Sequence, residues 1–157
     1  MRELKDLPWW KAIDIPPVWL VLFIALAWIQ SRRLPVFPLD HPILDLIGGV
    51  LVGGGVLLMV FAVLQLRQAK TTVIPHLDPN ALVTDGLFAR SRNPIYLGDA
   101  MVLAGLCLFW GSWLALLLVP LFIWLITDRF ILGEEERLRT AFGPSFEAWT
   151  RTTRRWI

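Results

Sequence analysis

The sequence predicts an all-α, polytopic integral membrane protein with about four transmembrane helices. Three observations support this fold class. Hydrophobic residues make up 56% of the 157 residues, and charged residues make up only 18%. The apolar residues also fall into four separate runs, which is atypical of a soluble domain. We expect a single membrane domain over residues 1–157, with an N-terminal two-helix part at 1–66. A loop, a helical hairpin and C-terminal helices follow at 67–157.

The first two runs predict one helix each. The run from about Ile15 to Ile29 has no small-residue cleavage site near it, so we expect a retained membrane span rather than a signal peptide. The run from about Pro42 to Leu66 is long enough to cross a hydrocarbon core of about 30 Å. It holds a cluster of glycines, and we expect Gly48, Gly49 and Gly53 to form a face that another helix approaches closely.

The third and fourth runs predict the helical hairpin. They extend from about Pro94 to Trp110 and from about Trp113 to Leu132, and the two residues between them are too few for anything except an antiparallel pair. Asn93 is a favoured N-cap residue, and proline is favoured at the first helical position, so the third helix begins at Pro94.

The C-terminal residues predict two short amphipathic helices. Glu134, Glu135 and Glu136 are expected at the start of the first, where carboxylates favour the positive end of the helix dipole. Gly143 and the proline after it end that helix. Phe146 and Trp149, three residues apart, predict a last amphipathic turn at the membrane surface.

The distribution of basic residues predicts the orientation. With four spans, both termini and the middle loop share one side, which leaves only Arg32 and Arg33 as basic residues on the other. The positive-inside rule then places the termini and the loop in the cytoplasm. We expect a bacterial inner-membrane protein with its active site on the cytoplasmic side.

Two polar segments are expected to meet at this cytoplasmic edge. The segment RSRNPIY precedes the third helix and GEEE follows the fourth, so the hairpin returns both to one place. Asp99, one turn further into the third helix, is costly in a membrane, and we expect an arginine of the loop to pair with it. Tyr96 is the only tyrosine, which suggests a use for its hydroxyl group.

Several chemistries are excluded by composition. No nucleophilic triad can be assembled, and a single cysteine with scattered acidic residues makes a poor zinc site. His76 is more often a loop histidine than a catalyst, and its role stays open. We expect neither a metal nor a nucleic-acid partner. The remaining arginines, amide, phenol and carboxylates suit a zwitterionic ligand with a flat ring.

The segments LVTDGLFARSRNPIYLG and EEERLRTAFGPSFEAW together resemble the isoprenylcysteine carboxyl methyltransferase family, whose wider relatives include phospholipid N-methyltransferases. The resemblance spans about half of the chain and implies an S-adenosylmethionine-dependent methyltransferase that acts on a lipophilic or lipid-linked acceptor. It implies a substrate-positioning role for Arg129, and either Arg92 or Arg129 could hold an anionic acceptor. The residues implied to bind S-adenosyl-L-methionine are Ala81, Leu82, Val83, Phe88, Asn93, Pro94, Tyr96, Gly98, Glu134 and Glu135.

The chain departs from the family pattern at Asn93, where histidine is common, and at Phe88 and Phe146, where tyrosine is common. Asparagine does not titrate near neutral pH, so a histidine base at this position is excluded. An amine or phenol acceptor would need a general base to remove its proton, and Glu134, Glu135 and His76 are candidates for that base.

The acceptor itself, a carboxylate, thiol, amine or phenol, and the oligomeric state are left open by the sequence. The alternatives are an NADPH-dependent membrane reductase of the steroid 5α-reductase type and a non-enzymatic membrane adaptor.

Overall fold

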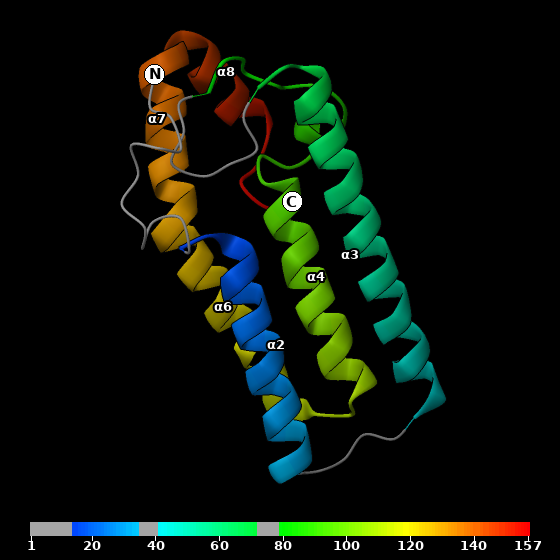
Figure 1. Cartoon of the computed structure of the whole chain (residues 1–157). Helices are drawn as coiled ribbons and strands as arrows, with labels where there is room; N and C mark the ends of the chain where they lie inside the picture. Colours follow the sequence, from blue (N-terminus) through cyan, green and yellow to red (C-terminus); the bar gives the residue numbers. More distant parts are fainter. Residues whose placement is uncertain (1–13, 35–40, 72–78) are drawn as a thin grey trace.

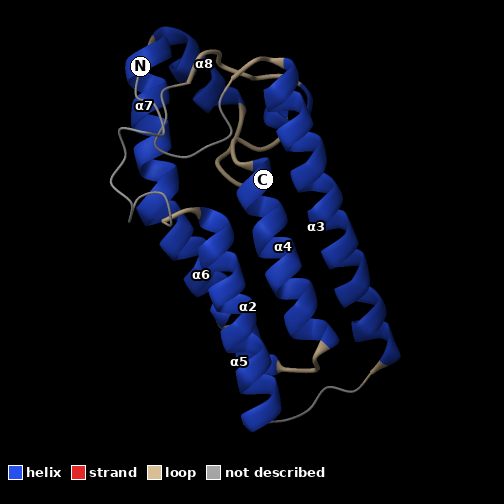
Figure 2. Cartoon of the chain, in the orientation of Figure 1, coloured by secondary structure: helices blue, strands red, loops and turns tan. Residues whose placement is uncertain are grey.

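The computed structural model describes residues 14–34, 41–71 and 79–157, and within them it is all-α, as predicted (Figures 1 and 2). His76 lies outside the described residues. Three helices correspond to the first three apolar runs. They are α2 (Pro16–Arg33), α3 (Pro42–Gln68) and α4 (Pro94–Phe109). A 3-10 helix, η2 (Gly86–Ala89), lies between α3 and α4.

The fourth run is part of a longer helical rod than the sequence predicted. The rod runs without a break over Trp113–Phe142. Its successive parts are α5 (Trp113–Leu116), α6 (Leu118–Ile126), the π-helical turn η3 (Thr127–Ile131) and α7 (Leu132–Phe142). Glu134 and Glu135 lie in the first turn of α7, as predicted, but α7 continues directly from η3 and does not begin as a separate helix. Most residues of this stretch are good helix formers, and Gly133 alone is too weak a signal to end a helix.

The last helix, α8 (Pro144–Thr152), begins after Gly143 turns the chain with a φ of 46°. The predicted end of the preceding helix at Gly143 is confirmed. Phe146 and Trp149 of α8 are buried inside the protein, 1% and 6% exposed. The predicted amphipathic turn is present as α8, but Phe146 and Trp149 do not face outward, because both side chains pack onto the cluster that contains Val83 and Phe88.

Helix α4 packs closely against α3 along glycines spaced two turns apart on each helix (Figure 1). A Cβ atom on Gly48 would lie 2.7 Å from the carbonyl oxygen of Gly105, and one on Gly55 would lie 2.7 Å from that of Gly98. A Cβ atom on Gly49 or Gly53 would meet nothing within 4 Å. The close face is therefore formed by Gly48 and Gly55, and the prediction for Gly49 and Gly53 is wrong.

The other face of α4 packs against α2 and the α5–α6 part of the rod. The rings of Phe23 and Phe122 meet edge to face with centroids 5.3 Å apart, and Leu103 of α4 is fully buried in the same cluster. The four long helical elements form a bundle that holds the start of α4 beside α7 (Figure 1).

Two of the described helices are long and apolar enough to cross a membrane: Pro42–Gln68 and Trp113–Phe142; Pro94–Phe109 is apolar but shorter. Helix α3 also exposes large apolar side chains along its length, including Leu46 at 67% and Phe61 at 57%. A continuous exposed apolar surface of this kind requires lipid or a partner to cover it. The molecule is therefore an all-α membrane protein.

Candidate functional site

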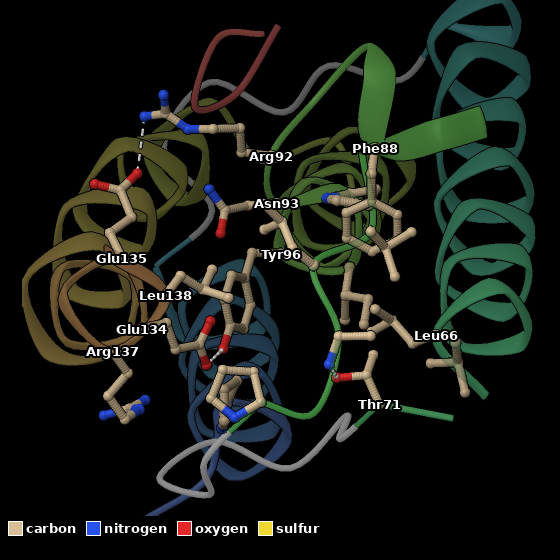
Figure 3. A pocket seen from close by; sticks show the side chains of 18 of the residues that line it. Leu66, Thr71, Phe88, Arg92, Asn93, Tyr96, Glu134, Glu135, Arg137 and Leu138 are labelled. Atoms are coloured by element: carbon tan, nitrogen blue, oxygen red, sulfur yellow. Dashed lines mark hydrogen bonds and ion pairs between the residues drawn. The ribbon is translucent and has the colours of Figure 1, made fainter. Parts of the chain in front are cut away.

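A cavity of about 480 Å³ lies where α3, α4, α7 and α8 meet the segment before α4 (Figure 3). The predicted site residues that line it come from both polar segments and from the segment before them. They are Ala81, Leu82, Val83, Phe88, Arg92, Asn93, Pro94, Tyr96, Glu134 and Glu135. The convergence expected from the hairpin is therefore present.

Tyr96 and Glu134 form the polar contact between α4 and α7. The Tyr96 hydroxyl donates a hydrogen bond of 2.6 Å to Oε1 of Glu134, and both side chains face the cavity (Figure 3). Tyr96 lies in the first turn of α4, which Pro94 begins, so its position follows from the local helix start. This bond is the one that fixes the Glu134 carboxylate at the cavity wall.

The π-helical turn η3 sets which residues of α7 face the cavity. A π turn holds one residue more than an α turn. The residues after it are therefore rotated by about 100° relative to an uninterrupted α-helix. Glu134 and Glu135 lie within the first turn of α7 after this π turn, and both reach the cavity. The residue pattern of the sequence did not predict this π-helical turn.

Glu135 joins the loop before α4 to the C-terminal strap, by which we mean residues 153–156. Its Oε1 accepts bonds of 2.8 Å from Arg92 Nη2 and 2.9 Å from Arg155 Nε, and its Oε2 accepts one of 2.7 Å from Arg155 Nη2. The hydrogen bonds that Arg155 donates to the Glu135 carboxylate hold the pKa of Arg155 above its ordinary value. The main role of Glu135 is therefore to join the loop before α4 to the strap.

The strap is also fixed by the backbone of the RSRN segment. The Arg92 amide donates to the Arg154 carbonyl at 3.0 Å, and the Asn93 side chain donates to the Arg155 carbonyl at 3.0 Å. Asn93 occupies the predicted N-cap position, but its side chain makes no capping bond. The expected capping role is wrong because the Asn93 amide is used by the strap instead.

One buried group of this cluster lacks a partner. Among the described residues, the Nε atom of Arg92 is buried and has no hydrogen-bond acceptor. Burying an N–H donor without a partner costs about 1–3 kcal/mol. An anionic or acceptor group bound in the adjoining cavity would satisfy it.

An apolar wall lines the cavity beside these polar groups. It contains Phe88, Leu138, Phe146 and Trp149. The Trp149 indole donates a hydrogen bond of 2.9 Å to the Phe88 carbonyl, which holds α8 against η2. A flat ring would find aromatic and aliphatic surface here.

Asp99 also lines the cavity, and it is only 4% exposed. The expectation of an arginine partner from the loop is wrong, because the guanidinium of Arg92 binds Glu135 instead. Within residues 14–34, 41–71 and 79–157, Asp99 makes no hydrogen bond or ion pair.

Two of the predicted site residues lie elsewhere. Arg129 is half-exposed outside the cavity, where its Nε donates to Asp14 at 2.8 Å and its guanidinium lies 5.3 Å from the Trp19 ring centroid. Gly98 faces α3, where a Cβ atom would come within 2.5 Å of Met59 Cγ. The geometry gives Gly98 a packing role and does not bring Arg129 to the cavity.

The cavity also has lining residues that sequence reasoning missed. Pro16, Met59, Val63 and Thr71 come from parts of the chain distant from both motifs, and Arg137 lies within the acidic motif. The Thr71 hydroxyl accepts bonds of 3.2 Å from the amides of Asn80 and Ala81, which positions the segment before η2. Only Arg137 carried a usable signal, since it belongs to the acidic motif.

Comparisons with known proteins give two matches. Residues 44–145 match the family described as phospholipid methyltransferase. The Protein-S-isoprenylcysteine O-methyltransferase of Schizosaccharomyces pombe is 34% identical over 70 residues, which are 45% of this chain and 30% of the yeast protein. The chain therefore spans less than a third of the length of this curated relative. No solved structure matches the chain.

Proposed function

Because the chain belongs to the phospholipid methyltransferase family, we propose that it transfers a methyl group to a lipophilic acceptor in the membrane. The family uses S-adenosylmethionine as its methyl donor. The observation that carries the proposal is the cavity, because nine of the ten residues that the family resemblance assigned to the donor line it together. A match to methyltransferases favours this activity over the reductase and adaptor alternatives.

The residues present fit S-adenosylmethionine. Ligand cavities for small molecules have volumes of about 300–1,000 Å³, and this one has about 480 Å³. Phe88, Leu138 and Trp149 offer an apolar surface for an adenine ring. The free Nε–H of Arg92 suits a carboxylate, and the Glu134 carboxylate suits an ammonium group or a ribose hydroxyl.

The bound donor supplies an electrophilic methyl group on a sulfonium, and such transfers depend mainly on alignment and on exclusion of water. The residues of this chain provide both conditions. The Tyr96–Glu134 bond keeps the carboxylate in one position, and the Glu135 cluster joins the strap to Arg92, which lines the cavity. The wall of Phe88, Phe146 and Trp149 keeps that side of the cavity apolar.

The membrane arrangement that supports this function has four spans, formed by α2, α3, α4 and the Trp113–Phe142 rod. The positive-inside rule then places the start of α4 and the end of the rod on the cytoplasmic side, in a bacterium the inner-membrane face. The water-soluble donor would reach the cavity from there, and the acceptor from the lipid. Prenylated termini, phospholipid amines and small lipophilic thiols all suit such an entrance.

Calorimetric titration of the detergent-purified chain with S-adenosylmethionine and S-adenosylhomocysteine tests the proposal. We expect the wild-type chain to bind both and Glu134→Gln to bind both at least about tenfold more weakly, since a hydrogen bond to a charged group contributes about 1.5–3 kcal/mol. Glu136→Gln is the matched control, because Glu136 is exposed and lies outside the cavity. Absence of binding by folded wild-type chain would refute the methyltransferase proposal.

A further inference from the structure

Asp99 is the acidic group of the cavity that, among the described residues, has neither a hydrogen-bond donor nor a positive charge as its partner. Glu135 is held by two arginines, and Glu134 accepts from Tyr96 at 2.6 Å. Asp99 faces the same cavity, is 4% exposed, and has no partner in the described part of the chain. A carboxylate is rarely kept in such a place without a counter-charge.

The position of Asp99 separates it from the groups that suit the methyl donor. Asp99 and Tyr96 are three residues apart and therefore share a face of α4. Arg92 precedes the start of α4 and holds the strap there. Asp99 is five residues after Pro94 and therefore lies about 7 Å further along the helix. The methyl-donor groups and Asp99 therefore occupy successive levels of the cavity.

The lining around this deeper level is apolar. Met59 packs against Gly98, the residue before Asp99, and Pro16 and Val63 line the same cavity from α2 and α3. Helix α3 exposes large apolar side chains on its outer surface. A single negative charge among apolar side chains suits an amphiphile with a positively charged head and a hydrocarbon tail.

We propose that Asp99 is the specificity-determining residue for the methyl acceptor, and that it selects an amine whose nitrogen carries a positive charge on entry. The bound ammonium group then gives one proton to the Asp99 carboxylate, which frees the nitrogen lone pair that a methyl acceptor needs. The inference rests on the proposed function and names the acceptor class for the same cavity. A carboxylate acceptor would face Asp99 with like charge, which disfavours it. The chain would thus differ in acceptor from a relative whose printed name is that of an O-methyltransferase.

Binding of three amphiphiles with the same tail tests the role of Asp99. Dodecylamine, dodecanoate and dodecanol would be titrated calorimetrically, at equal mole fractions in maltoside micelles, into the wild-type chain and into Asp99→Asn. We expect the wild type to prefer dodecylamine and Asp99→Asn to bind it roughly tenfold to a hundredfold more weakly. Binding of dodecanol should be unchanged.

Two further variants control for folding and for surface charge. Asp99→Glu keeps the charge and should retain the preference for dodecylamine over dodecanol. Glu147→Gln removes one negative charge from the exposed face of α8 and should match the wild type. All samples would also be titrated with S-adenosylhomocysteine, and we expect equal affinities.

The outcomes separate this inference from the proposed function. Wild-type chain that binds S-adenosylhomocysteine but shows no amine preference would overturn the role of Asp99 alone, as would a preference that Asp99→Asn retains. Weaker binding of S-adenosylmethionine, but not of S-adenosylhomocysteine, by Asp99→Asn would assign the carboxylate to the donor and also overturn the inference. Failure of the folded wild type to bind S-adenosylhomocysteine would refute both proposals.

Discussion

Replacing Glu135 by glutamine removes the charge that joins the loop before α4 to the C-terminal strap. The side chains of Arg92 and Glu135 are only 12% and 11% exposed, so the guanidinium would be left buried without its counter-charge. Breaking a buried pair in this way costs about 3–5 kcal/mol. We take the lower end, about 3 kcal/mol, because Arg92 Nη1 retains a bond of 3.3 Å to the Thr153 carbonyl. Arg155 is more exposed, at 35%, and its pairing adds at most about 1 kcal/mol.

The chain contains its own reporter for this measurement. Cys107 is the only cysteine and is fully buried, so a maleimide dye that fluoresces on reaction follows thermal unfolding in detergent. A loss of about 3 kcal/mol lowers the midpoint of a chain of this size by about 6–12 °C. Glu136→Gln is the control, because its pair with Arg139 is exposed, 67% and 49%, and it should shift the midpoint by less than about 2 °C.

Equal midpoints for Glu135→Gln and Glu136→Gln would refute the reasoning, since they would mean that Glu135 is not held between buried arginines.

Two other predictions use the same unfolding assay. Gly105→Ala should destabilise the chain by about 1–3 kcal/mol, because its Cβ atom would lie 2.6 Å from the Gly48 carbonyl oxygen. Gly49→Ala, where a Cβ atom meets nothing within 4 Å, should be neutral or stabilise by up to about 1 kcal/mol; a lower midpoint for Gly49→Ala than for Gly105→Ala would contradict the assigned packing face. Trp149→Phe removes the bond to the Phe88 carbonyl and should cost about 1–3 kcal/mol. A midpoint equal to that of the wild type would exclude this bond as a support of α8.

The fold was predictable where a local signal fixed it. Long apolar runs and the proline at position 94 gave α3 and the start of α4 within a few residues. The two-residue connection at Gly111 and Ser112 required the third and fourth runs to be antiparallel neighbours. The meeting of the two polar segments followed from that connection.

Features that depend on distant parts of the chain were not predictable. Five glycines in α3 are alike in sequence, and only the position of α4 selects Gly48 and Gly55 as its contacts. Asn93 is a residue type that favours the N-cap position, but its side chain donates a hydrogen bond to the strap, some sixty residues later in the chain. The π-helical turn has no residue signature, yet it decides which glutamates reach the cavity.

The site was predicted best where both motifs contributed and worst where charge alone was used. Residues of the LVTDGLFARSRNPIY segment line the cavity largely as expected. Arg129 was chosen because it precedes the acidic motif, but Asp14, more than a hundred residues earlier, pairs with it. The pairing expected for Asp99 was wrong because the guanidinium of Arg92 pairs with Glu135 instead.

The central claim is that the cavity between α4, α7 and α8 binds the methyl donor. Ultraviolet labelling of the purified chain with methyl-tritiated S-adenosylmethionine, followed by peptide mapping, tests it most directly. The structure predicts label on aromatic residues of the cavity, Phe88, Tyr96, Phe146 or Trp149, and suppression of that label by excess S-adenosylhomocysteine. Suppressible label on Trp28, an exposed residue of α2 outside the cavity, with none on the four cavity residues, would contradict the claim.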